Sequence, residues 1–345
     1  MTTYDTETID IADLAPDQFN ELAIEQGWSD GLPLIPPTEA AVARFVAAAG
    51  RVDNATYQPI SPRQVVPTLK SLAANAVMAG CKPEYFPVVL AGLRAVLNPD
   101  YNLHGTLATT HPCAQLMVVS GPIRRELDIN CGTNCLGQGR RANATIGRAL
   151  QLVLLNIGGA KPGDMDRATQ GTPAKYAYCF GENEEESPWE PYHVRRGFAA
   201  GDSVVTALAA EAPHNINDHA STSGEGLVMT IAGTMSQAGS NTVYLRGPCF
   251  VVIGPEHAQT LHRDGWTPKS IQDALYERSR VAVSRISREN QESWAGQGRH
   301  PIDGHYYLGR TPDDLHIVVA GGAGKHSVYI SSFGNTAASS ARITR

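Results

Sequence analysis

Three cysteines stand in or beside one glycine-rich stretch of the chain, and their types and spacing could do chemistry together. Cys113 follows a Thr-Thr-His-Pro run, and Cys131 and Cys135 lie four positions apart in the sequence NCGTNC. Three thiolates can hold an iron–sulfur cluster with one open iron, which acts as a Lewis acid. With His104 or His111 as a fourth ligand, the same thiolates can hold zinc. We therefore predict that Cys113, Cys131 and Cys135 are metal ligands in one cleft.

Other interpretations of these thiols stay open. One cysteine could be a nucleophile, activated by His111 and by the N-terminus of the helix that follows, since both lower a thiol pKa. Cys131 and Cys135 could instead pair reversibly in a thiol–disulfide oxidoreductase. The spacing matches no strict metal signature, and buried cysteine also packs as a small apolar residue. We interpret the remaining three, Cys81, Cys179 and Cys249, as packing residues.

The segment HNINDH, residues 214–219, is dense in polar groups that can move protons. The roles we predict are proton transfer by His111, His214 and His219, orientation of an imidazole by Asp218, and substrate binding by Asn215. The alternative is an ordinary loop before a helix that is capped by the T-x-x-E pattern at 222–225. The histidines expected at the surface or in helix caps are His257, His262, His300, His305 and His316.

Two glycine-rich segments could bind an anion. GGAGKHS, residues 321–327, is not a phosphate loop, because its first glycine is misplaced and a strand follows it. We still assign Lys325 and His326 to the site, since ligands of α/β proteins bind beyond the carboxyl ends of strands. The alternative is a tight hairpin.

GQGRRA, residues 137–142, lacks the preceding strand and the acidic residue of a dinucleotide site. It starts a helix, whose free N–H groups attract an anion together with nearby arginines. The substrate-binding residues predicted here are Asn134, Arg140, Arg141, Asn143 and Thr145, with a solvated helix face as the alternative.

Apolar periodicity and cap residues place the elements that must position these groups. Helices are expected at residues 16–26, 38–49, 67–79, 83–97, 143–155, 223–236, 255–263 and 268–280. Strands are expected at 116–120, 204–208, 250–253, 315–320 and 327–330. The pattern predicts an α/β fold with two related α/β halves, mixed sheets and Gly-rich loops at strand ends, preceded by N-terminal helices.

We place the halves at residues 1–185 and 186–345, with one compact unit as the alternative. The boundary falls in a glutamate run that begins at Glu182, which we interpret as a solvated loop; a divalent-ion site is the alternative.

Composition excludes several classes of protein. The net charge of −6 and the lack of a basic tract argue against nucleic-acid binding, and no apolar run is long enough to span a membrane. The first residues lack the basic and apolar stretches of a signal peptide, so we expect a cytoplasmic protein with reduced thiols. A homo-oligomer is expected of such an enzyme.

Several longer motifs resemble the bacterial UGSC-like family, which is labelled after a selenocysteine-containing relative. They are GWSDGLP (27–33), NAVMAGCKPEYFP (75–87), NLHG (102–105), TTHP (109–112), RANATIGR (141–148), EEESPWEP (184–191), PHNINDH (213–219) and GGAGKHS (321–327). The resemblance implies one folded unit with a shared polar pocket. The UGSC motif itself is absent, so selenol redox chemistry does not carry over, and the three clustered cysteines are implied to be special to a subgroup.

Taken together, these residues predict an enzyme that acts on a small anionic molecule by a lyase or hydrolase type reaction. A Cys-ligated metal centre (iron–sulfur or zinc) or a cysteine nucleophile would act with histidine acid–base groups. The alternatives are a thiol–disulfide oxidoreductase that uses Cys131 and Cys135, and a non-catalytic ligand-binding subunit.

Overall fold

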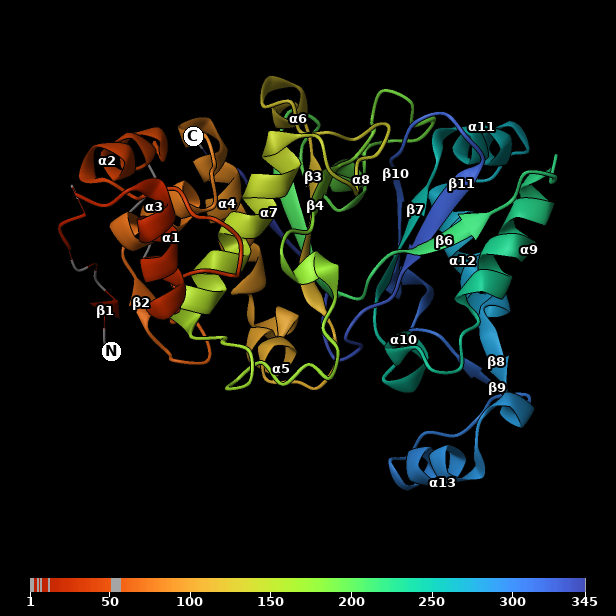
Figure 1. Cartoon of the computed structure of the whole chain (residues 1–345). Coiled ribbons are helices and arrows are strands. Elements are labelled where there is room, and N and C mark those ends of the chain that lie inside the picture. The colour runs from red at the N-terminus through yellow and green to blue at the C-terminus, as the bar shows by residue number, and fades with distance from the viewer. Residues whose placement is uncertain (1–2, 5, 7, 12, 51–56, 345) are drawn as a thin grey trace.

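Two four-stranded mixed sheets stand side by side in the computed structural model, which describes residues 3–4, 6, 8–11, 13–50 and 57–344 (Figure 1). Helices flank both sheets, so the predicted α/β class is confirmed. Two short two-stranded sheets complete the strands of the described residues, and they pair β1 (Thr3–Tyr4) with β2 (Val66–Pro67) and β8 (Arg280–Ala282) with β9 (His305–Tyr307). None of the helices in the described ranges has the length and apolar character to cross a membrane.

The first sheet has the order β12-β5-β3-β4. Its strands are β3 (Ala114–Ser120), β4 (Cys179–Gly181), β5 (Val204–Ala210) and β12 (Ser339–Arg342). β3 is parallel to β4 and antiparallel to β5, which in turn is antiparallel to β12. Every residue of β3 and β5 is buried, because helices and the second sheet leave neither face to solvent. This burial explains their nearly continuous apolar sequences.

The second sheet has the order β10-β7-β11-β6 and repeats this pattern. Its strands are β6 (His214–Asn217), β7 (Cys249–Ile253), β10 (Leu315–Val319) and β11 (His326–Ile330). β7 is parallel to β10 and antiparallel to β11, and β6 is antiparallel to β11. The segment of β6 was expected to be a loop. It forms a strand because β11 pairs with it and provides hydrogen-bond partners for its backbone N–H and C=O groups.

The chain crosses between the sheets twice. β6 follows β5 directly but joins the second sheet, and β12 follows β11 but returns to the first. At the crossing, Glu211 N donates to Ser331 O and Phe333 N donates to Ala209 O. Strand pairing therefore does not follow a boundary at residue 185, since β5 lies beyond it and pairs with β3. Each sheet has two antiparallel pairs and one parallel pair at an edge, while descent from a duplicated unit stays a prediction.

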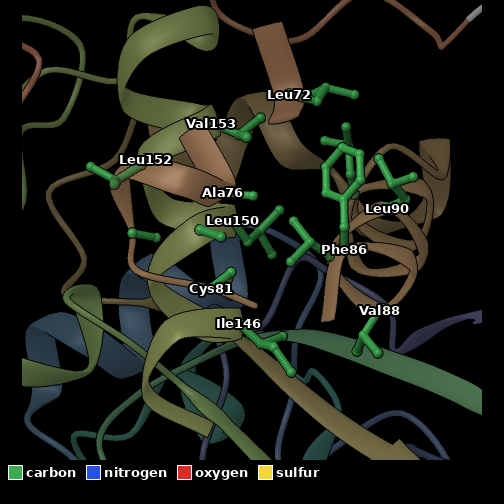
Figure 2. Close-up of a cluster of buried hydrophobic side chains, with 14 of the residues drawn as sticks. Leu72, Ala76, Cys81, Phe86, Val88, Leu90, Ile146, Leu150, Leu152 and Val153 are labelled. Carbon is green, nitrogen blue, oxygen red and sulfur yellow. The ribbon is translucent and has the colours of Figure 1, made fainter. Parts of the chain in front are cut away.

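Helices before and between the strands build the core beside the first sheet. They are α1 (Pro16–Glu25), α2 (Glu39–Ala48), α3 (Leu69–Met78), α4 (Phe86–Val96), α5 (Leu103–Leu107), α6 (Ile123–Glu126), α7 (Arg141–Val153) and α8 (Tyr192–Arg195). Figure 2 shows where α3, α4 and α7 meet, through side chains that include Leu72, Phe86 and Leu150. α3 begins two residues later than expected, because Thr68 is its N-cap and accepts from Ser71 N.

Short helical turns accompany the helices beside the first sheet. They are 3₁₀ turns at Pro83–Tyr85, Pro99–Tyr101 and Pro173–Lys175 and a π turn at Leu154–Gly158, which follows α7.

A second core lies beside the second sheet. Its helices are α9 (Gly224–Met235), α10 (Asn241–Tyr244), α11 (Pro255–Arg263), α12 (Pro268–Arg278) and α13 (Arg288–Gly296). 3₁₀ turns lie at Val283–Arg285 and Pro312–Asp314. Ser223, rather than the expected T-x-x-E pattern, caps α9 by accepting from Gly226 N. α13 projects with β8 and β9 at the lower right of Figure 1, where Trp294 packs edge-on against Tyr244 and Tyr306.

The two sheets point the same way. The segments that follow β3, β4 and β7, with α6, α8 and α11, lie at the top of the view, and α5 and α10 lie at the bottom (Figure 1). Asn183 N, just after β4, donates to Val319 O at the end of β10. The carboxyl ends of both parallel strand pairs therefore meet at one edge of the molecule, which we call the carboxyl edge.

Candidate functional site

The three predicted metal ligands do not share one centre. Cys113 directly precedes β3 at its amino end. Cys131 lies at the carboxyl edge, where its Sγ is 3.7 Å from Nη1 of Arg124 in α6. A strand of seven residues separates these places by roughly 20 Å, so Cys113 cannot join Cys131 and Cys135 as a ligand. The fault in the prediction was to treat nearness in sequence as nearness in space across a strand.

The thiols are also in surroundings that keep them protonated. All six cysteines are free, and only Cys131 is partly exposed. Burial raises the pKa of Cys113 to about 12 and that of Cys135 to about 11. It also raises the pKa of Cys131, although Arg124 opposes the shift. A thiolate nucleophile is therefore disfavoured near neutral pH. The packing role expected for the other three, Cys81, Cys179 and Cys249, agrees with their burial.

Two of the predicted catalytic histidines lie away from the carboxyl edge. His111 is beside the amino end of β3, where its Nε2 is 2.8 Å from Oε1 of Glu211. His214 begins β6, opposite Tyr329 of β11, and is exposed. The amino ends of β3 and β6 are at the far side of the sheets from the carboxyl edge, so neither ring reaches His219.

Four other predicted residues do converge at the carboxyl edge. His219 follows β6 and His326 begins β11, and their Nε2 atoms are 3.2 Å apart. Oδ1 of Asn215 lies 2.9 Å from Nδ1 of His326, and Nζ of Lys325 donates to His219 O at 3.1 Å. The antiparallel pairing of β6 with β11 causes this convergence, because it places the end of one strand beside the start of the other.

The hydrogen bonds around this pair assign the ring protons. An amide oxygen can only accept, so Nδ1 of His326 donates to Asn215, and in the neutral ring Nε2 is then the acceptor. His219 Nε2 then donates to His326 Nε2. The two Nε2 atoms thus share one proton, and each ring could exchange a proton with a bound molecule when this hydrogen bond opens. We refer to His219 and His326 as the histidine pair.

Asp218 and His257 support the pair from the interior. The Asp218 carboxylate accepts from Thr230 Oγ1 at 2.6 Å and from Ser221 N at 2.9 Å. These hydrogen bonds outweigh the opposing effect of burial and lower the pKa of Asp218 to about 2. Buried His257 joins the Asp218 carbonyl to Ser327 Oγ, and burial lowers its pKa. Asp218 therefore fixes the loop and does not orient an imidazole through its carboxylate.

Two buried histidines depart from the expectation of surface or cap positions. His257 is 2 % exposed, and His316 in β10 is 7 % exposed. Burial lowers the pKa of His316 to about 3, so its ring is neutral. Both side chains are covered by neighbouring elements of the fold. The sequence around each histidine does not indicate which elements pack against it.

The glycine loop before Lys325 lies where the two sheets meet. Gly321 N donates to Cys131 O, and a Cβ on Gly322 would stand 2.0 Å from Thr133 Oγ1. Only glycine therefore fits beside the Thr133 hydroxyl. Gly324 N donates to Glu256, whereas the amides of Gly322 and Ala323 donate to no group in the described part of the chain. Two free N–H groups and one lysine thus lie close in sequence to the histidine pair.

The substrate-binding residues predicted around residue 137 have structural contacts instead. Buried Asn143 bonds the backbone of Asn130 and Cys135, which braces the NCGTNC loop. The other contacts run from Arg141 to the carbonyls of Gly80 and Cys81, from Thr145 to Arg141 O, from Arg140 to Asp128, and from Asn134 to Gln138 O.

A buried acidic cluster stands at the carboxyl ends of β3 and β4. Glu182 is 1 % exposed and accepts from Ser120 Oγ at 2.6 Å and from Tyr192 N at 2.7 Å. Burial raises its pKa to about 7. Glu184 pairs with Arg124 at 2.8 Å, and Nδ1 of His193 is 3.8 Å from Oε1 of Glu184. The solvated loop expected here is thus wrong for Glu182.

A cavity of about 580 Å³ opens on the opposite side, at the amino end of β3. It lies between α7, the π turn after it and the segment that ends in Lys175. Its polar lining includes Cys113, Gln115, Gln151 and the ion pair of Asp166 with Lys175. Nε2 of Gln151 is buried without a hydrogen-bond partner among the described residues. Sequence reasoning missed this cavity, because its walls come from segments with no shared motif.

Two of the long motifs also meet in space. Asp30 of GWSDGLP accepts two hydrogen bonds from Arg148 of RANATIGR, at 2.7 and 2.8 Å. Asn156 donates to Trp28 O and to Oδ1 of Asn75. These contacts give the motifs a structural role, which is to lock the loop after α1 onto α3 and α7.

Comparisons with known proteins gave no match, either to a model of a protein family or to a curated protein. The resemblance to the UGSC-like family therefore stays a prediction.

Proposed function

We propose that this protein is an enzyme that acts on a small anionic molecule at the histidine pair, by a lyase or hydrolase type reaction. The observation that carries the proposal is the convergence of Asn215, His219, Lys325 and His326 from two segments more than a hundred residues apart in the chain. An edge beyond the carboxyl ends of parallel strands is also the usual place for ligands of α/β proteins.

The acidic group of the substrate, a carboxylate or a phosphate, would bind Lys325 and the free amides of Gly322 and Ala323. In an elimination, Nε2 of His326 removes the proton from the neighbouring carbon. The electron pair of that C–H bond forms the double bond, and the leaving group departs with the Nε2 proton of His219, whose ring would enter the step as imidazolium and leave it neutral. In a hydrolysis, His326 takes the proton of a water molecule whose oxygen attacks, and the leaving group again takes the proton of His219.

A panel of small carboxylates and phosphate monoesters, followed by proton NMR for turnover, tests this proposal. His326→Gln is expected to lower turnover by at least about 100-fold, since one acid–base group contributes roughly that much. The matched control is His262→Gln, because His262 is exposed at the end of α11 and lies outside the site. Inorganic phosphate should also shift the amide signals of Gly322 and Ala323. If no panel member turns over and phosphate leaves both amides unmoved, the proposal fails.

Ligand binding without turnover is the second candidate, and the cavity favours it. A volume of about 580 Å³ is in the range of small-molecule sites, and Lys175 and Gln151 offer polar partners. Lys175→Met should then abolish ligand-induced stabilisation that His326→Gln leaves intact. The thiol–disulfide alternative has less support, because burial raises the pKa of both Cys131 and Cys135.

A further inference from the structure

The strongest unexplained feature is His193 in α8. Its side chain is fully buried, and neither ring nitrogen has a hydrogen-bond partner among the described residues. A buried polar atom without a partner costs about 1–3 kcal/mol, so native proteins rarely leave two on one ring. The ring is aimed at two carboxylates: ligand atoms of Glu182, Glu184 and His193 all lie within 4.8 Å of one another.

The charges around this cluster are unbalanced. Arg124 is buried and pairs with Glu184, while it also pairs with the more exposed Glu185. Glu182 is held by an uncharged hydroxyl and a backbone amide. The nearby Arg195 donates to Ile317 O and not to Glu182. One buried carboxylate is therefore left without a cationic partner, beside an imidazole with two free nitrogens.

We propose that Glu182, Glu184 and His193 bind one divalent transition-metal ion of the zinc class. Two carboxylate oxygens and an imidazole nitrogen suit zinc, whereas magnesium and calcium prefer oxygen ligands alone. With bonds of about 2.0 Å, ligand atoms of a tetrahedral ion lie about 3.3 Å apart, so shifts of about 1 Å would close the site. Each carboxylate oxygen keeps a lone pair beyond its present hydrogen bond.

The position of the cluster assigns the ion a structural role. Glu182 directly follows β4 and accepts from Ser120, the last residue of β3. Glu184 accepts from Gly121 N, just after β3, and His193 lies in α8. Asn183, between the two glutamates, donates to Val319 O at the end of β10 and to Gly321 O in the loop that follows. An ion here would brace the joint where the carboxyl ends of both sheets meet. This inference does not rest on the proposed function, since no step at the histidine pair involves these residues.

The test uses the untagged full chain, produced with zinc in the medium and washed free of loosely held metal. We expect about one zinc per chain by elemental analysis, and a melting temperature that falls when a strong chelator removes it and recovers when zinc is returned. Replacement by Co²⁺ should give visible bands without the strong thiolate charge-transfer band of a cysteine site. A chain that binds no zinc, or a cobalt spectrum with that thiolate band, would overturn the proposal.

Variants locate the ion. His193→Gln should lose the zinc and the zinc-dependent rise in melting temperature. This substitution breaks no side-chain hydrogen bond among the described residues, since the ring makes none with them. Glu185→Gln is the matched control, because Glu185 pairs with Arg124 but lies outside the cluster. The double variant His219→Gln/His326→Gln removes the exposed histidine pair and should keep the zinc. Retention of zinc by His193→Gln, or its loss from the double variant, would contradict the assignment.

Discussion

The ion pair of Asp30 with Arg148 should be one of the strongest single contacts in the molecule. The two side chains are 12 % and 13 % exposed, and they form two hydrogen bonds of 2.7 and 2.8 Å. At an effective dielectric constant of about 20 and a charge separation of about 4 Å, the attraction is about 4 kcal/mol. Solvent screening at the partly exposed edge of the pair weakens this attraction, so we expect a coupling free energy of about 2–3 kcal/mol.

A double-mutant cycle with Asp30→Asn and Arg148→Met, measured by urea unfolding, gives this coupling directly. The control cycle removes Arg288 and Glu292 of α13, which are also 2.7 Å apart but 88 % and 63 % exposed. Its coupling should be about 0.5 kcal/mol or less. For a cooperative unit of 345 residues, a loss of about 3 kcal/mol lowers the melting temperature by roughly 4 °C. A buried-pair coupling no larger than that of the exposed pair would refute the reasoning.

Two further predictions concern the carboxyl edge. Burial raises the pKa of Glu182 from 4.5 to about 7, against the effect of its hydrogen bonds to Ser120 and Tyr192, so the folded state binds this proton more tightly than the unfolded state does. In metal-free protein, the contribution of Glu182 to the free energy of unfolding is fully present below pH 4.5. It is lost as the pH rises through 7, which lowers the free energy of unfolding by up to about 3 kcal/mol. Glu182→Gln should remove that part of the pH dependence of urea unfolding, and an unchanged profile would show another group to be responsible. Among the six thiols, partly exposed Cys131 should react first with a disulfide reagent in the native protein. Cys131→Ser should abolish the fast phase, and a fast phase that survives would place the accessible thiol elsewhere.

Local features of the chain were predictable because they depend on neighbours in sequence. Proline at N1 and threonine N-caps place the starts of α2, α11 and α12, since each satisfies or removes an unpaired backbone N–H. The continuous apolar runs identify β3, β7 and β10 as buried strands. In the same way, Asn215, His219, Lys325 and His326 stood out as polar groups at strand ends. Their types and positions were readable before any contact between them was known.

Which of these groups meet was decided by strand pairing alone. Antiparallel pairing of β6 with β11 brings His219 to His326, and the length of β3 keeps Cys113 from Cys131. Burial also depends on the tertiary structure. The sequence predicted that Glu182 is solvated, yet it is buried where the two sheets meet. Sequence spacing reports the distance along one strand or helix. The exchange of β6 and β12 between sheets sets distances across the molecule, and no local pattern encodes it.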